Sequence, residues 1–108
     1  MDEEYIEAVL GEVEQIPAGS VRSYGEIAEL VGRGGPRQVG HVMSSYGAAV
    51  PWWRVVRADG RPVAGHEEQA LTLLRAENVP LKGGRIDLRQ VRRKGGRSGA
   101  GQPDPEQK

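Results

Sequence analysis

The sequence of 108 residues predicts a mainly α-helical domain with a small β-hairpin, of the winged-helix-like type that contains a helix-turn-helix. Three observations predict this class. Apolar residues recur at helical spacing in several separate segments. Two of these segments are joined by a short glycine-rich turn, as in a helix-turn-helix. Short apolar runs bounded by glycine and proline follow them and are typical of short strands.

The length fits one domain, which we place at residues 1–93. From about Lys94 the chain consists mainly of glycine, serine, proline, glutamine and charged residues. Such a composition cannot bury a core, so residues 94–108 are expected to form a disordered tail.

Two amphipathic helices are expected in the first third of the chain. Residues 3–14 form the first, and the proline- and glycine-containing segment 16–20 ends it. Ser23 and Glu26 match a capping box, which predicts a second, short helix that Gly32 ends. The apolar residues of the first helix fall on one face: Ile6, Val9, Leu10 and Val13.

A third helix is expected over residues 36–46, with Pro36 at its first position. Gly40 in its middle costs about 1 kcal/mol relative to alanine, which indicates that another backbone must approach closely there. One face is apolar and predicted to be buried: Val39, Val42, Met43 and Tyr46. The other face is small or basic and predicted to be exposed: Arg37, Gly40, His41 and Ser44.

The second half of the chain predicts a short strand at residues 54–57, a hairpin turn near Asp59-Gly60 and a helix over 66–77. A last strand or turn is expected near residues 86–91. Its apolar anchors are Ile86, Leu88 and Val91.

Composition excludes several kinds of chemistry. The sequence has no cysteine, so it can form no disulfide, thiolate nucleophile or zinc finger. His41 and His66 are its only histidines and do not have the spacing of a metal-ligand set, so we expect neither a metal nor a cofactor. Neither a signal peptide nor an apolar run of membrane-spanning length is recognisable. We therefore expect a cytoplasmic protein, and we expect it to be a monomer.

The net charge is zero, but the charges are unevenly distributed. Residues 1–30 carry eight acidic residues and one arginine, whereas residues 31–66 carry five arginines and one aspartate. The folded domain could present one basic face suited to nucleic acid, or these residues could simply be solvated.

The segment Pro51-Trp52-Trp53-Arg54 places two large aromatic residues side by side. In an extended segment, adjacent side chains point to opposite sides, so one tryptophan can enter the core while the other lines a cavity. The alternative is that both are partly buried packing residues.

Residues 16–28, with Arg37-Gln38-Val39-Gly40 and Pro51-Trp52-Trp53-Arg54-Val55-Val56, form three ordered motifs. Together they resemble the C-terminal DNA-binding domain of 6-O-alkylguanine-DNA alkyltransferases, over about residues 5–79. In that family the second and third positions of the last motif are the alkyl-accepting cysteine and its activating histidine. Here they are Trp52 and Trp53, and an indole is neither a nucleophile nor a base. The chain is therefore similar to the alkyltransferase-like proteins, which are not enzymes.

The resemblance implies that the protein binds alkylated guanine in duplex DNA through the minor groove, flips the base and flags it for nucleotide excision repair proteins. It would then be associated with the nucleoid when bound to DNA. It implies that Tyr24 lies near the phosphate of the flipped nucleotide, that Arg37 fills the gap in the base stack and that the Val55 carbonyl accepts from the guanine amine. The implied DNA-binding residues are Ser23, Tyr24, Arg37, Gln38, Gly40, His41 and Ser44. The implied pocket residues are Tyr24, Pro51, Trp52, Val55, Val63, Ala64 and Gly65.

Two other functions fit parts of the pattern. The helix pair and the expected hairpin near Asp59-Gly60 also suit a winged-helix transcriptional regulator that reads undamaged DNA. A domain of this family that binds only protein would show no salt-dependent binding to DNA. The basic run at residues 89–97 could also act as a non-specific DNA clamp.

Overall fold

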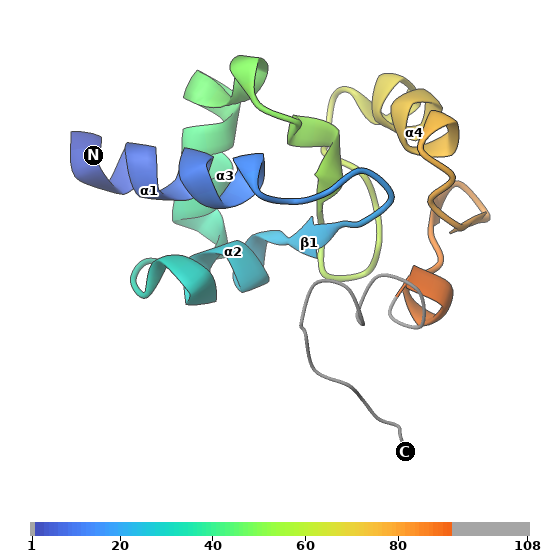
Figure 1. Ribbon diagram of the computed structural model, residues 1–108, viewed down its shortest axis with the longest axis horizontal. Coiled ribbons are helices and arrows are strands. Elements are labelled where there is room, and N and C mark those ends of the chain that lie inside the picture. Colours follow the sequence, from blue (N-terminus) through green and yellow to red (C-terminus); the bar gives the residue numbers. More distant parts are fainter. Residues whose placement is uncertain (1, 92–108) are drawn as a thin grey trace.

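The computed structural model describes residues 2–91 and confirms a mainly helical domain with short strands (Figure 1). The predicted disordered tail at residues 94–108 lies outside this range. Within it, no helix is long and apolar enough to cross a membrane. The elements are α1 (Glu3–Glu14), β1 (Arg22–Ser23), α2 (Tyr24–Val31), α3 (Pro36–Tyr46), the 3-10 turns η1 (Gly47–Ala49) and η2 (Trp52–Arg54), β2 (Val55–Val56), α4 (Glu67–Ala76), β3 (Leu81–Lys82) and β4 (Arg85–Ile86).

Local sequence signals set the ends of the helices. The capping box is present, because the Ser23 hydroxyl accepts from the Glu26 amide at 3.1 Å and the Glu26 carboxylate accepts from the Ser23 amide at 2.8 Å. Gly32 ends α2 in the left-handed conformation, with φ +93°. The predicted helices at residues 3–14 and 36–46 are confirmed, and α2 and α3 pack as the predicted helix pair. On the face of α3 predicted to be buried, Val39, Val42 and Met43 are buried, but Tyr46 at the end of the helix is 52% exposed.

The start of α1 supports the turn between α2 and α3. The Asp2 carboxylate caps α1 by accepting from the Tyr5 amide at 2.6 Å, and it also pairs with Arg33 at 3.2 Å. The Arg33 guanidinium lies over the Tyr5 ring, 5.2 Å from its centroid. Gly34 lies against the Tyr5 phenol so closely that a Cβ would collide with it. The helix-turn-helix is therefore fixed from outside by the first helix.

Gly34→Ala should destabilise the fold by about 3 kcal/mol. About 1–2 kcal/mol would come from the left-handed backbone, with φ +75°, and the rest from the clash with Tyr5. Gly32→Ala is a matched control, since its φ is also positive but nothing lies within 4 Å of its Cβ position. Urea unfolding of both variants measures the difference. Equal destabilisation of the two would show that the contact with Tyr5 imposes no constraint.

Two apolar clusters form the core and meet at β2. Val55 belongs to the cluster under α1, α2 and α3, whereas Val56 belongs to the cluster with Leu74, Val79 and Ile86. The strand β2 pairs with β1 in parallel, and its register aligns Arg22 with Val55 and Ser23 with Val56. The link before α2 is thereby tied to the middle of the chain, between the two clusters.

Two expectations about the second half are wrong. The segment Trp52–Arg54 is a 3-10 turn and not extended, since the Arg54 amide donates to the Pro51 carbonyl at 3.1 Å. The turn at Asp59-Gly60 joins no paired strands. The antiparallel hairpin is β3–β4, where Gly83 and Gly84 both have positive φ, as the favoured two-residue hairpin turn requires.

Candidate functional site

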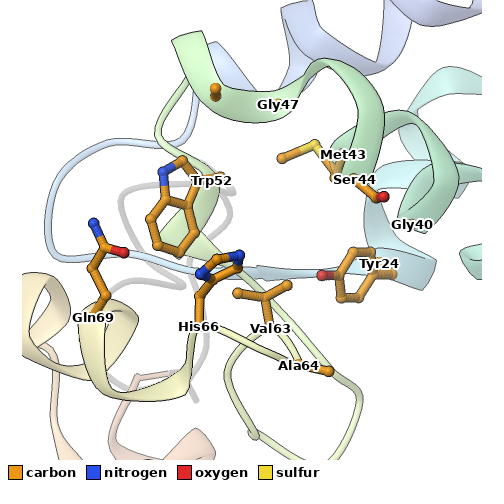
Figure 2. A pocket seen from close by; sticks show the side chains of 11 residues that line it. Tyr24, Gly40, Met43, Ser44, Gly47, Trp52, Val63, Ala64, His66 and Gln69 are labelled. Carbon is orange, nitrogen blue, oxygen red and sulfur yellow. The ribbon is translucent and has the colours of Figure 1, made fainter.

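A cavity of about 420 Å³ opens between the helical half of the domain and the segment that leads into α4 (Figure 2). Its walls come from the start of α2, the middle and end of α3, η1, η2, the loop before α4 and the first turn of α4. The lining residues are Tyr24, Gly40, Met43, Ser44, Gly47, Ala48, Trp52, Val63, Ala64, His66 and Gln69.

Four of the residues expected in a pocket line this cavity: Tyr24, Trp52, Val63 and Ala64. Three others do not line it. The Val55 side chain is fully buried in the core and cannot contact a bound base. The expected hydrogen bond from the guanine amine to the Val55 backbone carbonyl stays a prediction. Gly65, with φ +91°, forms the turn just before α4, and Pro51 precedes η2.

The residues expected to contact DNA are divided between the cavity and the surface of α3. Gly40 and Ser44 line the cavity, while Arg37 and His41 are exposed on α3 outside it. The Gln38 side chain accepts from the Gly35 amide at 2.9 Å, so its carbonyl oxygen caps α3. Ser23 is similarly engaged, because its hydroxyl caps α2.

The indole of Trp52 and the phenol of Tyr24 form opposite walls of the cavity (Figure 2). Trp52 packs on the first core cluster, and its ring centroid lies 6.0 Å from that of His66. Figure 2 shows the Tyr24 hydroxyl pointing into the space between the walls. Burial raises the pKa of Tyr24, so its hydroxyl is a neutral hydrogen-bond donor at physiological pH. The cavity therefore offers a flat apolar surface opposite a polar donor.

Trp53 faces away from the cavity. It packs against the second core cluster, its ring is perpendicular to that of Trp52, and its indole N–H donates to the Glu77 carboxylate at 3.0 Å. The sequence alone left the direction of Trp53 open. The structure assigns it to packing, with a hydrogen bond that satisfies its polar edge.

Glu77 and Arg54 form an ion pair behind the cavity wall. The Arg54 guanidinium donates to both carboxylate oxygens, at 2.6 and 3.0 Å, and to the Ile16 carbonyl at 2.8 Å. Burial alone would raise the pKa of Glu77, but the hydrogen bonds from Arg54 and Trp53 outweigh it and hold the pKa below its usual value. This network ties η2, which carries Trp52, to the end of α4 and to the segment after α1.

Sequence reasoning missed several residues of the site. These are Met43, Gly47, Ala48, His66 and Gln69 in the cavity lining, and Glu77 behind it. His66 is one of only two histidines and directly follows the expected pocket loop, which was a usable signal. The sequence carries no comparable signal for Gln69 and Glu77. These residues lie in and just after α4, and only the packing of this helix brings them to the site. Among residues 2–91, no group of three histidine, aspartate or glutamate side chains is placed to hold a metal ion.

Comparison with known proteins identifies the family. The chain matches the family described as "6-O-methylguanine DNA methyltransferase, DNA binding domain" over residues 4–79. It is 30% identical over 96 residues to a DNA base-flipping protein of Vibrio parahaemolyticus, covering 83% of this chain and 96% of the relative. It is 38% identical over 88 residues to alkyltransferase-like protein 1 of Schizosaccharomyces pombe, covering 75% of this chain and 81% of the relative.

A crystal structure agrees with these matches. The structure of Atl1 from S. pombe in complex with damaged DNA containing O6-carboxymethylguanine has a TM-score of 0.73 at 29% identity. That similarity covers 84% of this chain and 95% of the other. Since the sequence has no cysteine, no thiolate is present to accept an alkyl group. The chain belongs to the family of the 6-O-methylguanine DNA methyltransferase DNA-binding domain, in its non-catalytic, alkyltransferase-like and base-flipping branch.

Proposed function

We propose that this protein binds duplex DNA containing an O6-alkylated guanine, flips the damaged base into the cavity between Tyr24 and Trp52, and holds it there without removing the alkyl group. The main observation in support of this proposal is that the cavity lies beside the face of α3 that carries only small or basic residues, namely Arg37, Gly40, His41 and Ser44. A crystallised relative is bound to DNA with an O6-carboxymethylguanine, which supports the same class of lesion.

The energetics of base flipping are consistent with this site. Extruding a base costs a few kcal/mol of stacking and pairing, and less when the base is damaged. Stacking the base on Trp52 returns about 1–3 kcal/mol. Arg37, exposed in the first turn of α3, can insert its planar guanidinium into the gap. Because glycine and serine keep the cavity side of α3 small, the helix can approach the minor groove closely.

The absence of repair chemistry follows from Trp52. The indole ring stands where the family's enzymes carry the acceptor cysteine, and it cannot form the thioether product of alkyl transfer. The bound lesion is therefore unchanged and must be processed elsewhere. We propose that the complex flags it for nucleotide excision repair. Loss of this protein should then sensitise cells to alkylation only when excision repair is intact, and equal sensitisation without that pathway would reject this role.

Titration of two otherwise identical fluorescent duplexes tests the function. One holds 6-O-methylguanine and the other guanine, and we expect clearly tighter binding to the methylated duplex. Arg37→Ala should weaken binding to it by about 10–100-fold, the equivalent of 1–3 kcal/mol of stacking. Arg75→Ala is the matched control, since Arg75 is exposed on α4 and does not line the cavity.

Equal affinity for the two duplexes would falsify lesion recognition. A footprint at a particular sequence of undamaged DNA would instead favour a winged-helix regulator. The exposed face of α3 argues against that reading, because it offers few side chains able to read base edges.

A further inference from the structure

The parallel pairing of β1 and β2 brings the backbone of Arg57 next to that of Tyr24, a residue that lines the cavity. Ser23 is aligned with Val56, so Tyr24 and Arg57 are the next residues on the two neighbouring segments. Paired strands lie about 4.8 Å apart, so both residues leave the pair at the same edge. The sequence separates them by more than thirty positions and gives no sign of this proximity.

Electrostatics agrees with the register. Burial raises the pKa of Tyr24, and the positive charge of Arg57 partly opposes that rise. Arg57 also contributes to lowering the pKa of Asp59 and of Glu67, although backbone hydrogen bonds are the larger cause for both carboxylates.

Arg57 lines a second, smaller groove of about 270 Å³ and is not among the residues that line the first cavity. The lining residues of this groove are Arg57, Arg61, Pro62, Glu67, Gly83, Gly84 and Arg85. Asp59 pairs with Arg61 at 3.3 Å and with Arg85 at 4.0 Å. Arg57 is exposed and, among residues 2–91, has no carboxylate within ion-pair distance.

We propose that Arg57 is a further DNA-contacting residue, whose guanidinium binds a phosphodiester of the strand that carries the flipped nucleotide, close to the phosphate that the family resemblance assigns to Tyr24. This inference rests on the proposed function and adds Arg57 to the residues that hold the DNA. A guanidinium can donate two parallel hydrogen bonds to a phosphate. Arg61 and Arg85, which both pair with Asp59, line the same groove as Arg57.

The test compares Arg57→Gln with Arg75→Gln, the same change at an exposed arginine of α4. Binding to both duplexes is measured over a range of salt concentrations. We expect Arg57→Gln to weaken binding about tenfold for both duplexes and to reduce the salt slope by about one phosphate contact, because phosphate contacts carry no base information. Arg75→Gln should match the wild type in both measurements.

Neutral methylphosphonate linkages, placed one at a time around the lesion, locate the phosphate. The wild-type protein should lose affinity at each linkage whose phosphate it contacts, and Arg57→Gln should lose clearly less than the wild type at one of these linkages only. If Arg57→Gln has the affinity and salt slope of Arg75→Gln while the wild type still prefers the methylated duplex, the phosphate contact of Arg57 is rejected and lesion recognition stands. A weakened variant that keeps full sensitivity to every linkage also rejects it. A wild type without preference would reject the proposed function itself.

Discussion

Glu77→Ala is expected to lower the free energy of unfolding by about 2–3 kcal/mol, less than the roughly 3–5 kcal/mol of a fully buried ion pair, because this pair is partly buried. The Arg54 and Glu77 side chains are only 16% and 15% exposed, so solvent screens the pair weakly. The substitution leaves a charged guanidinium without its carboxylate. It also leaves the indole N–H of Trp53 without an acceptor. Urea unfolding monitored by tryptophan fluorescence measures the loss.

The pH dependence of stability gives a second measure of the same interaction. The hydrogen bonds from Arg54 and Trp53 outweigh burial and keep the pKa of folded Glu77 below that of the unfolded chain. The stabilisation that ionised Glu77 contributes is therefore fully present at pH values above the pKa of Glu77 in the unfolded chain. It is lost as the pH falls through the pKa of Glu77 in the folded protein. The stability difference between wild type and Glu77→Ala should shrink in acid.

Glu68→Ala is the control for this experiment, because Glu68 is exposed in the first turn of α4 and its side chain makes no hydrogen bond or ion pair among the described residues. We expect it to change stability by less than about 0.5 kcal/mol. A Glu77→Ala variant no less stable than Glu68→Ala would show that the ion pair contributes nothing net to the fold. Glu77→Gln should fall between the two, since its carbonyl oxygen can still accept one hydrogen bond.

The elements predicted well from sequence are those with local determinants. The bounds of α1 and α3 follow from apolar spacing over a few turns, and α2 begins at a capping box whose two partners are three residues apart. Gly32 at the end of α2 needs only its own backbone conformation. Such features are decided within a short stretch of chain, so a single sequence suffices to find them.

The features missed from sequence depend on contacts between distant segments. Two-residue strands such as β1 and β2 have no periodicity to detect, and their parallel register is set by packing on both clusters. The conformation of η2 was misjudged because the aromatic pair Trp52-Trp53 suits an extended segment equally well. In the 3-10 turn, the Trp53 indole N–H donates a hydrogen bond to Glu77, which lies 24 residues further along the chain. No local sequence pattern indicates such a contact. The position of α4 also determines that His66 enters the cavity.

Trp52→Ala is expected to remove most of the preference for methylated DNA. The stacking surface opposite Tyr24 would be lost, which corresponds to about 1–3 kcal/mol, or about 10–100-fold in affinity for the lesion duplex. Binding to the unmodified duplex should change little, because phosphate contacts and the surface of α3 remain. The ratio of the two affinities, measured by the duplex titration, is therefore the informative quantity.

The neighbouring tryptophan provides the matched control. Trp53→Phe removes an indole that faces the second core cluster and bonds Glu77, so it should lower stability while preserving the preference for the methylated duplex. Trp52→Phe keeps an aromatic surface and should retain part of that preference, which separates loss of stacking from misfolding. The opposite pattern, with preference lost in Trp53→Phe and kept in Trp52→Ala, would exclude Trp52 as the stacking wall. Because the two residues are adjacent in sequence and differ mainly in the direction they face, the comparison isolates the role of the cavity from that of the core.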